Sequence, residues 1–140
     1  IFKKPRAERG HKNSNWRDKR PGMDPKHAEN IRKLPCCLPF CPCSPGGQIH
    51  HLKETGACER GMSVRSTDKF GVPMCPGDHL NGVERRGSKR ELDWFRERGI
   101  EVLDLAASLW GARGDLDAMK RIVLAVKDSA ESVLKSRGVR

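Results

Sequence analysis

The sequence predicts a small α+β domain held together by a zinc ion, with a ββα core and added helices that end in an amphipathic one. Apolar residues make up only 36% of the 140 residues, which is too little for a large core, so a small domain needs a metal or disulfide staple. All six cysteines lie between residues 36 and 75. In the same stretch, two short apolar runs flank a long polar loop, which predicts a strand pair.

Residues 1–23 are expected to form a basic, disordered or extended arm, because they are poor in apolar residues. Residues 1–33 hold 11 basic and 4 acidic residues, a net charge of +7. The arm could be a solubilising tail or could contact phosphates. The candidate contacts are Lys3, Lys4, Arg6, Arg17, Lys19 and Arg20 of the arm, with Arg85 and Arg86 further along.

The whole chain has a net charge of +10, which favours polyanionic partners, nucleic acid before anionic membrane. No apolar run approaches the roughly 20 residues of a membrane span. No pattern of a secretion signal opens the sequence either. We therefore expect DNA rather than membrane as the partner, and a cytoplasmic location.

The domain is expected to span residues 24–111 and to open with a short helix. Asp24 suits the N-cap and Pro25 the first helical position, while Pro35 ends the run. One face of this helix is apolar, with Ala28, Ile31 and Leu34.

A knuckle at residues 36–43 leads into the predicted strand pair. The strands are expected at 48–52 and 69–74, with the loop 53–68 between them and a helix from His79 to about Arg85 behind them. This order of elements is a ββα unit.

The cysteines predict a tetrahedral zinc site more strongly than three disulfides, because bridges within so tight a cluster are geometrically awkward. Cys36 and Cys41 supply one pair of ligands, and Cys75 supplies the second pair together with Asp78 or His79. Cys37 and Cys43 are alternatives for the first ligand pair, and Cys58 lies in the loop between the strands.

Three more helices are expected after the ββα unit. Ser88 and Glu91 have the spacing of a capping box for the first, which ends at Gly99. The second runs over residues 101–110. Within residues 112–140, Asp115 caps a long amphipathic helix that packs on the domain or forms a homodimer. Its apolar residues are Leu116, Met119, Ile122, Val123, Val126, Ala130, Val133 and Leu134.

The doublet His50-His51 stands at the end of the first strand. Adjacent strand residues point to opposite faces, so one imidazole can bind a divalent metal while the other acts as a general base. A phosphodiester hydrolase needs both functions. Alternatively, both histidines belong to the zinc site or to the surface.

Several runs, in this order and spacing, resemble a group of phage and prophage HNH endonucleases that includes the RecA-dependent phage nuclease. The resemblance covers residues 24–110. Its segments are Asp24-Pro25-Lys26-His27, Ile31-Arg32-Lys33-Leu34-Pro35-Cys36, Ile49-His50-His51-Leu52, Ser66-Thr67-Asp68-Lys69-Phe70, Val72-Pro73-Met74-Cys75, Trp94-Phe95-Arg96-Glu97-Arg98-Gly99-Ile100 and Leu109-Trp110.

This resemblance implies a ββα-metal (HNH, or His-Me) finger in which His51 is the general base. Asp68 takes the place of the asparagine that tethers the loop, while His50 and His79 hold a catalytic Mg²⁺ or Mn²⁺. Cys36, Cys41 and Cys75 with Asp78 would bind the structural zinc. The implied substrate is DNA, the implied setting is the cytoplasm of a bacterial host, and a recombinase is an implied partner.

The chain departs from the family at two positions. Asp78 stands where relatives have Cys or His, and Val83 stands where they often have a histidine one helical turn beyond His79. We expect the side chain of Val83 to face the ion held by His79 without binding it. The alternative function is a catalytically degenerate, zinc-stapled DNA-binding or phage accessory protein.

Overall fold

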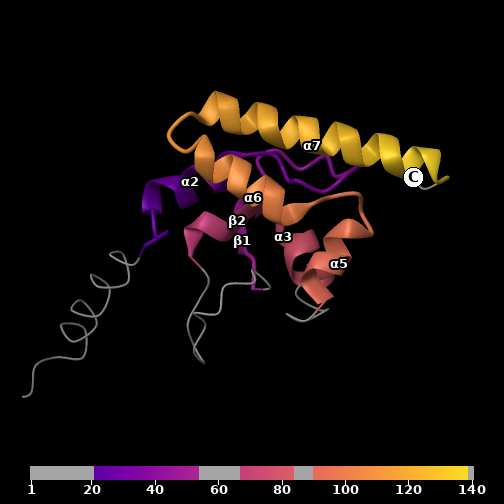
Figure 1. Cartoon of the computed structure of the whole chain (residues 1–140), viewed down its shortest axis with the longest axis horizontal. Helices are drawn as coiled ribbons and strands as arrows, with labels where there is room; N and C mark the ends of the chain where they lie inside the picture. The colour runs from indigo at the N-terminus through magenta and orange to yellow at the C-terminus, as the bar shows by residue number, and fades with distance from the viewer. Residues whose placement is uncertain (1–20, 54–66, 84–89, 139–140) are drawn as a thin grey trace, which may run out of the picture.

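The structure is a computed structural model that describes residues 21–53, 67–83 and 90–138. In these ranges helices surround a two-stranded sheet, so the predicted α+β class is confirmed (Figure 1). The elements in chain order are α2 (Pro25–Lys33), β1 (Gln48–His51), the 3₁₀ turn η1 (Asp68–Phe70), β2 (Gly71–Met74), α3 (Pro76–Asp78), the π-helical turn η2 (His79–Val83), α5 (Glu91–Arg96), α6 (Val102–Gly111) and α7 (Leu116–Ser136).

The predicted caps of the first and last helices are confirmed. The Asp24 carboxylate accepts a hydrogen bond from the backbone N–H of His27 at 3.1 Å, and Pro25 is the first residue of α2. Asp115 accepts from the N–H of Ala118 at 3.0 Å at the start of α7. In both helices a side-chain oxygen satisfies a donor that has no partner within the helix.

The two strands pair antiparallel, with Gln48 opposite Met74 and His51 opposite Gly71. β2 begins two residues later than the sequence predicted, because Asp68–Phe70 forms η1 instead of extended chain. The helix expected from His79 also differs: α3 already begins at Pro76, and the chain then widens into η2. The register places the histidine doublet at the end of the sheet where the chain approaches η1.

A single hydrophobic core joins the sheet with α2, α5, α6 and α7, from Ile31 of α2 through Met74 of β2 to Met119 and Val123 of α7. α7 lies along α6 and above the irregular chain that follows α2 (Figure 1). At Gly99, φ is +79° and an added Cβ would lie 3.1 Å from the Ala130 Cα, so the turn after α5 approaches α7 closely. The last helix therefore packs on the domain.

α5 begins at Glu91 with Arg90 as its N-cap, and no side chain caps it. The predicted capping box with Ser88 is therefore wrong for the helix start, and Ser88 itself lies outside the described residues. In the part of the chain that is described, no helix is both long enough and apolar enough to cross a membrane.

The side chain of Val83 belongs to the hydrophobic core and is only 2% exposed. The expectation that it faces a metal ion is wrong. The physical reason is that an apolar side chain gains free energy by burial, and Val83 at the end of η2 packs into the core.

His27 is a buried polar residue in α2. Its ring is 1% exposed, meets the edge of Trp110 at a centroid distance of 5.2 Å, and has no hydrogen-bond partner among the described residues. Burial lowers the pKa of His27, and Arg113 adds to this, while Asp24 and Asp68 oppose it.

His27→Leu is therefore expected to keep or raise the free energy of unfolding at pH 7.5, because it removes two buried nitrogens without partners. The wild type should lose stability as the pH falls below about 6.5, since only the unfolded chain then takes up the proton readily. The variant should lose less over the same range. Denaturant unfolding at pH 7.5 and 5.5 measures both effects, and equal losses in the two proteins would contradict the expectation.

Candidate metal centre and histidine site

Four potential metal ligands from two segments converge beside the sheet. The ligand atoms of Cys36, Cys41, Cys75 and Asp78 all lie within 4.8 Å of one another. The Asp78 Oδ2 is 3.0 Å from the Cys75 Sγ and 3.6 Å from the Cys36 Sγ, and the Sγ atoms of Cys41 and Cys75 are 3.8 Å apart. These are the four residues that the sequence predicted.

Local structure explains why these side chains meet. Cys75 is the N-cap of α3, so its sulfur and the Asp78 carboxylate lie on one turn, and the Asp78 N–H donates to that sulfur at 3.5 Å. In the preceding loop the Cys36 N–H donates to the Cys43 carbonyl at 3.0 Å. The Cys37 N–H donates to the Pro73 carbonyl of β2, also at 3.0 Å. The loop and the turn are thus held side by side.

Three sulfurs and one carboxylate oxygen form a donor set that suits a tetrahedral, borderline-soft cation such as Zn²⁺. Burial raises the pKa of the Cys36, Cys41 and Cys75 thiols. Because metals bind the thiolate, loading this cluster must release protons, and a bound cation reverses the cost of burying those charges. The cluster can hold a metal ion.

The other cysteines stand outside this cluster. The five that the structure describes carry free thiols, which gives the disulfide alternative no support among them. Cys37 is buried and Cys43 is exposed. Cys58 lies outside the described residues.

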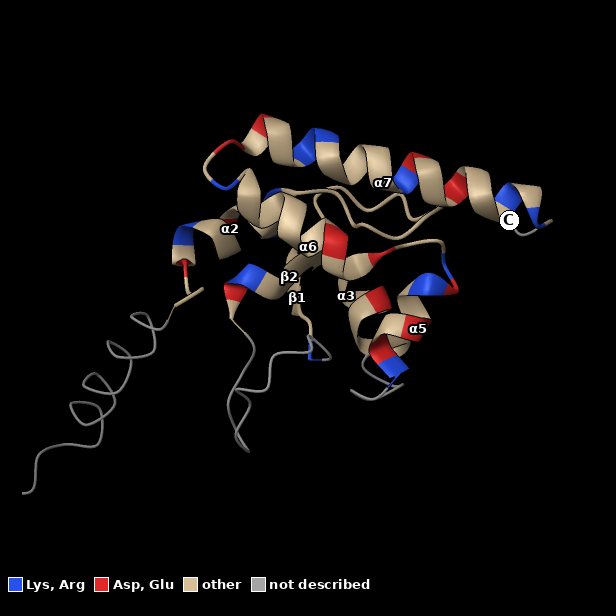
Figure 2. Ribbon diagram, in the orientation of Figure 1, with Lys and Arg blue, Asp and Glu red and all other residues tan. Residues whose placement is uncertain are grey.

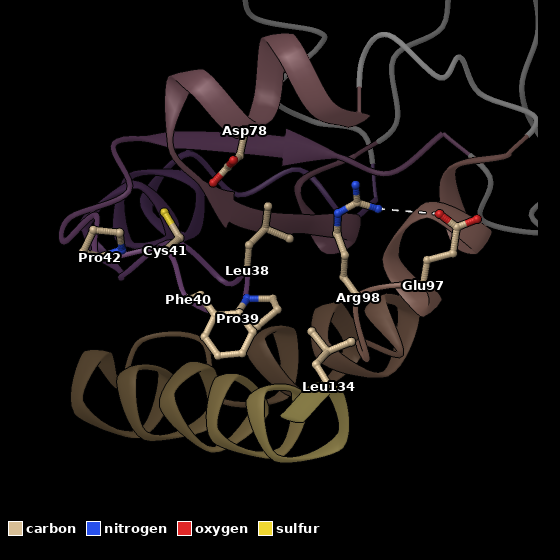
Figure 3. A pocket seen from close by; sticks show the side chains of 9 residues that line it. All are labelled: Leu38, Pro39, Phe40, Cys41, Pro42, Asp78, Glu97, Arg98 and Leu134. Atoms are coloured by element: carbon tan, nitrogen blue, oxygen red, sulfur yellow. Dashed lines mark ion pairs between the residues drawn. The ribbon is translucent and has the colours of Figure 1, made fainter. Parts of the chain in front are cut away.

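The cluster forms one wall of a cavity of about 630 Å³. Figure 3 shows Cys41 and Asp78 on this wall, with Leu134 of α7 and the Glu97–Arg98 ion pair on other sides. The side of the cluster that carries Cys41 and Asp78 therefore faces open space rather than packed core.

Each histidine of the doublet has its own carboxylate partner. The His50 Nε2 lies 2.5 Å from the Glu91 Oε1, and both side chains are almost fully buried. The His51 Nε2 lies 2.8 Å from the Asp68 Oδ1, and the His51 side chain is 32% exposed. The alternation of side chains along β1 sends one imidazole into the core and the other toward the surface.

Asp68 is held from two sides. Its Oδ2 accepts the backbone N–H of Asp24 at 2.9 Å, while its Oδ1 faces His51. Burial alone would raise the pKa of Asp68, but the hydrogen bonds from His51 and Asp24 outweigh it and leave the pKa below its usual value. An ionised carboxylate only accepts, so the proton of neutral His51 lies on Nε2 and its Nδ1 is the basic nitrogen.

Sequence reasoning missed Glu91, which it assigned to a helix cap. The Glu91 Oε2 accepts the backbone N–H of Lys53 at 2.7 Å, while Oε1 faces His50, so this residue joins α5 to the end of β1. A signal was present, because Glu91 precedes the buried Phe95 by four residues and so lies on the apolar face of its helix.

His79 lies beside the doublet. Its ring is 4.9 Å from that of His50, and its Nδ1 lies 2.8 Å from the Gln48 Oε1. Gln48 and His50 are on the same face of β1, two residues apart, which brings both to the first residue of η2. Within the described ranges, neither histidine belongs to a group of three clustered metal ligands.

The predicted phosphate contacts, in the arm and at Arg85 and Arg86, lie outside the described residues. Comparisons with family models, with curated proteins and with solved structures found no match to this chain. The functional argument therefore depends on the site itself.

The purified protein is expected to contain about one zinc ion per chain, because site formation and folding are coupled in small metal domains. Cys36→Ser and Cys75→Ser should both lose the ion, whereas Cys43→Ser, outside the cluster, should keep it. Metal analysis by mass spectrometry measures the content. Zinc loss in all three variants, or a zinc-free wild type that is folded, would contradict this assignment.

Proposed function

We propose that this protein is a metal-dependent HNH-type endonuclease that hydrolyses phosphodiester bonds in DNA. The observation that carries the proposal is the hydrogen-bonded pair of His51 and Asp68 at the end of β1, with His50 and His79 beside it. His51 is partly exposed and its partner is almost fully buried. This combination is typical of a general base held by a carboxylate.

In the proposed reaction the Nδ1 of His51 removes a proton from a water molecule. The water oxygen bonds to phosphorus as the bond from phosphorus to the 3′-oxygen breaks, and that oxygen takes up a proton. Asp68 keeps the ring in the productive tautomer and stabilises the imidazolium that forms. No change of oxidation state is involved.

His50 and His79 would hold the divalent ion, each through one ring nitrogen. When bound, Mg²⁺ or Mn²⁺ supplies positive charge that stabilises the departing oxygen. Glu91 accepts the Nε2 proton of His50, which directs the lone pair of Nδ1 away from the carboxylate. In the same proposal the Cys/Asp cluster holds structural zinc.

DNA as the substrate is supported by the distribution of charge along the sequence. The described residues hold 14 Lys and Arg against 13 Asp and Glu, a net charge of +1, so the remaining segments carry +9 of the total +10. Figure 2 accordingly shows basic and acidic residues mixed along α7. Residues 1–20 alone hold 8 basic and 2 acidic residues, a net charge of +6.

A catalytically degenerate, zinc-stapled DNA-binding or phage accessory protein is the second candidate. The packing of Val83 into the core favours it, because the expected third ligand for the catalytic ion is missing. The Nδ1 of His50, the nitrogen that would hold the ion, is also buried, which limits access to it. A recombinase partner and a bacterial cytoplasm remain implications of the family resemblance.

The wild type is expected to nick supercoiled plasmid in the presence of Mn²⁺ or Mg²⁺. His51→Ala should lose at least about 100-fold in rate, the usual contribution of a general base. His11→Ala, which removes a histidine of the arm, is the matched control and should retain the rate. Nicking is followed by gel electrophoresis, with zinc content measured for each protein. A folded, zinc-loaded wild type that is inactive, or as active as its His51→Ala variant, would favour the second candidate.

Deletion of residues 1–20 is expected to weaken DNA binding equally for unrelated sequences. The dependence of log K on log salt should flatten, because each phosphate contact that is lost removes roughly 0.9 from the slope. Fluorescence anisotropy with two unrelated duplexes at several salt concentrations measures the slope. An unchanged slope would show that the arm does not contact phosphate.

A further inference from the structure

Lys127 of α7 is a buried lysine that contacts the loop carrying Cys36 and Cys41. Its side chain is 9% exposed, and its Nζ donates to the backbone carbonyls of Cys36 at 2.8 Å and Cys41 at 2.7 Å. Those carbonyls belong to two of the four residues that form the metal-ligand cluster. Burying a lysine on an otherwise apolar helix face costs free energy unless its ammonium group is paired, so these two hydrogen bonds must offset that cost.

The neighbouring turns of α7 hold the same loop. The Glu131 Oε1 accepts the backbone N–H of Phe40 at 2.9 Å, and the Lys135 Nζ lies 5.9 Å from the centre of the Phe40 ring. Phe40 itself has a positive φ of 63°, a conformation that a bulky residue adopts only when its surroundings impose it. Residues 127, 131 and 135 therefore fix the loop at three successive turns.

The charge of the cluster gives Lys127 a second role. Three thiolates and one carboxylate carry four negative charges, so a site loaded with a divalent cation keeps a net charge of −2. The ammonium group of Lys127 is bonded to the backbone of two of these ligands. Its positive charge therefore lies beside a ligand cluster that carries excess negative charge.

We propose that Lys127 is a positioning residue of the metal centre. It holds the loop of Cys36 and Cys41 in its ligating conformation and offsets the excess negative charge, so ion binding and docking of α7 are thermodynamically coupled. By linkage, an ion in the cluster strengthens the docking of α7 by the same factor by which docking strengthens ion binding. This inference requires the cluster to bind a metal but does not require the nuclease activity.

The test is the zinc dissociation constant of the full chain, measured by competition with a chromogenic chelator at fixed pH and salt. Lys127→Met keeps the apolar stem and removes both the charge and the donors. It should weaken zinc binding about 10- to 100-fold, as the loss of a group that orients metal ligands usually does. Lys127→Arg should recover most of the affinity. Lys120→Met, an exposed lysine on the same helix, should match the wild type within about twofold.

A second readout separates this role from mere stabilisation of the fold. In the wild type, zinc should slow amide hydrogen exchange across residues 119–134, and in Lys127→Met this protection should be reduced. If Lys127→Met does not fold, Glu131→Gln, which weakens the acceptor for the Phe40 N–H, should still raise the zinc dissociation constant several-fold.

If Lys127→Met folds and its zinc dissociation constant equals that of the wild type, the proposal is overturned. If Lys127→Met does not fold, an unchanged zinc dissociation constant in Glu131→Gln overturns it. A wild type that binds no zinc would instead overturn the metal site on which the proposal depends. The nicking assay decides the proposed nuclease function separately.

Discussion

The fold depends on the convergence of the irregular loop after α2, the turn that begins α3 and the helix α7 on one cluster of ligands. The loop has no regular hydrogen-bonding pattern of its own. It is held by scattered backbone bonds, including Cys36 to Cys43 and Cys37 to Pro73, and by the side chains of α7. Four buried or half-buried acidic groups at such a point repel one another once they ionise, and a cation supplies the attraction that makes their proximity favourable. The two-stranded sheet adjoins this junction, because the Cys37 N–H donates to the Pro73 carbonyl of β2. A sheet of that size has little stability alone.

The sheet in turn divides the histidine doublet between two environments. His50 enters the core, where the Glu91 carboxylate offsets part of the cost of burying a polar ring. His51 reaches the surface, where it pairs with Asp68 and remains partly exposed. Two adjacent residues thus acquire different chemistry from the alternation of one short strand. A shift of the strand register by one residue would exchange their positions.

Local sequence patterns predicted much of the fold. Asp24 with Pro25, and Asp115 before its amphipathic run, were sufficient to place two helix starts, because caps depend on neighbouring residues alone. The clustering of Cys36, Cys41, Cys75 and Asp78 was predictable because metal sites restrict the residue types and their spacing. The contacts of Lys127 and Glu91 were not predicted, because their partners lie 91 and 41 residues away in the sequence. Val83 was placed at the metal but packs in the core. The sequence does contain a signal for Lys127, because this residue interrupts the three- and four-residue spacing of Met119, Val123, Ala130 and Leu134.

X-ray absorption spectroscopy at the zinc edge of the purified, full-length protein tests this account most directly, because it identifies the ligand atoms without any substitution. The cluster of Cys36, Cys41, Cys75 and Asp78 predicts three sulfur ligands at about 2.3 Å and one oxygen at about 2.0 Å. Four sulfur ligands would mean that Cys37, Cys43 or Cys58 takes the place of Asp78, and imidazole nitrogens would mean that the histidines belong to this site. Either result would contradict the assignment of the metal centre.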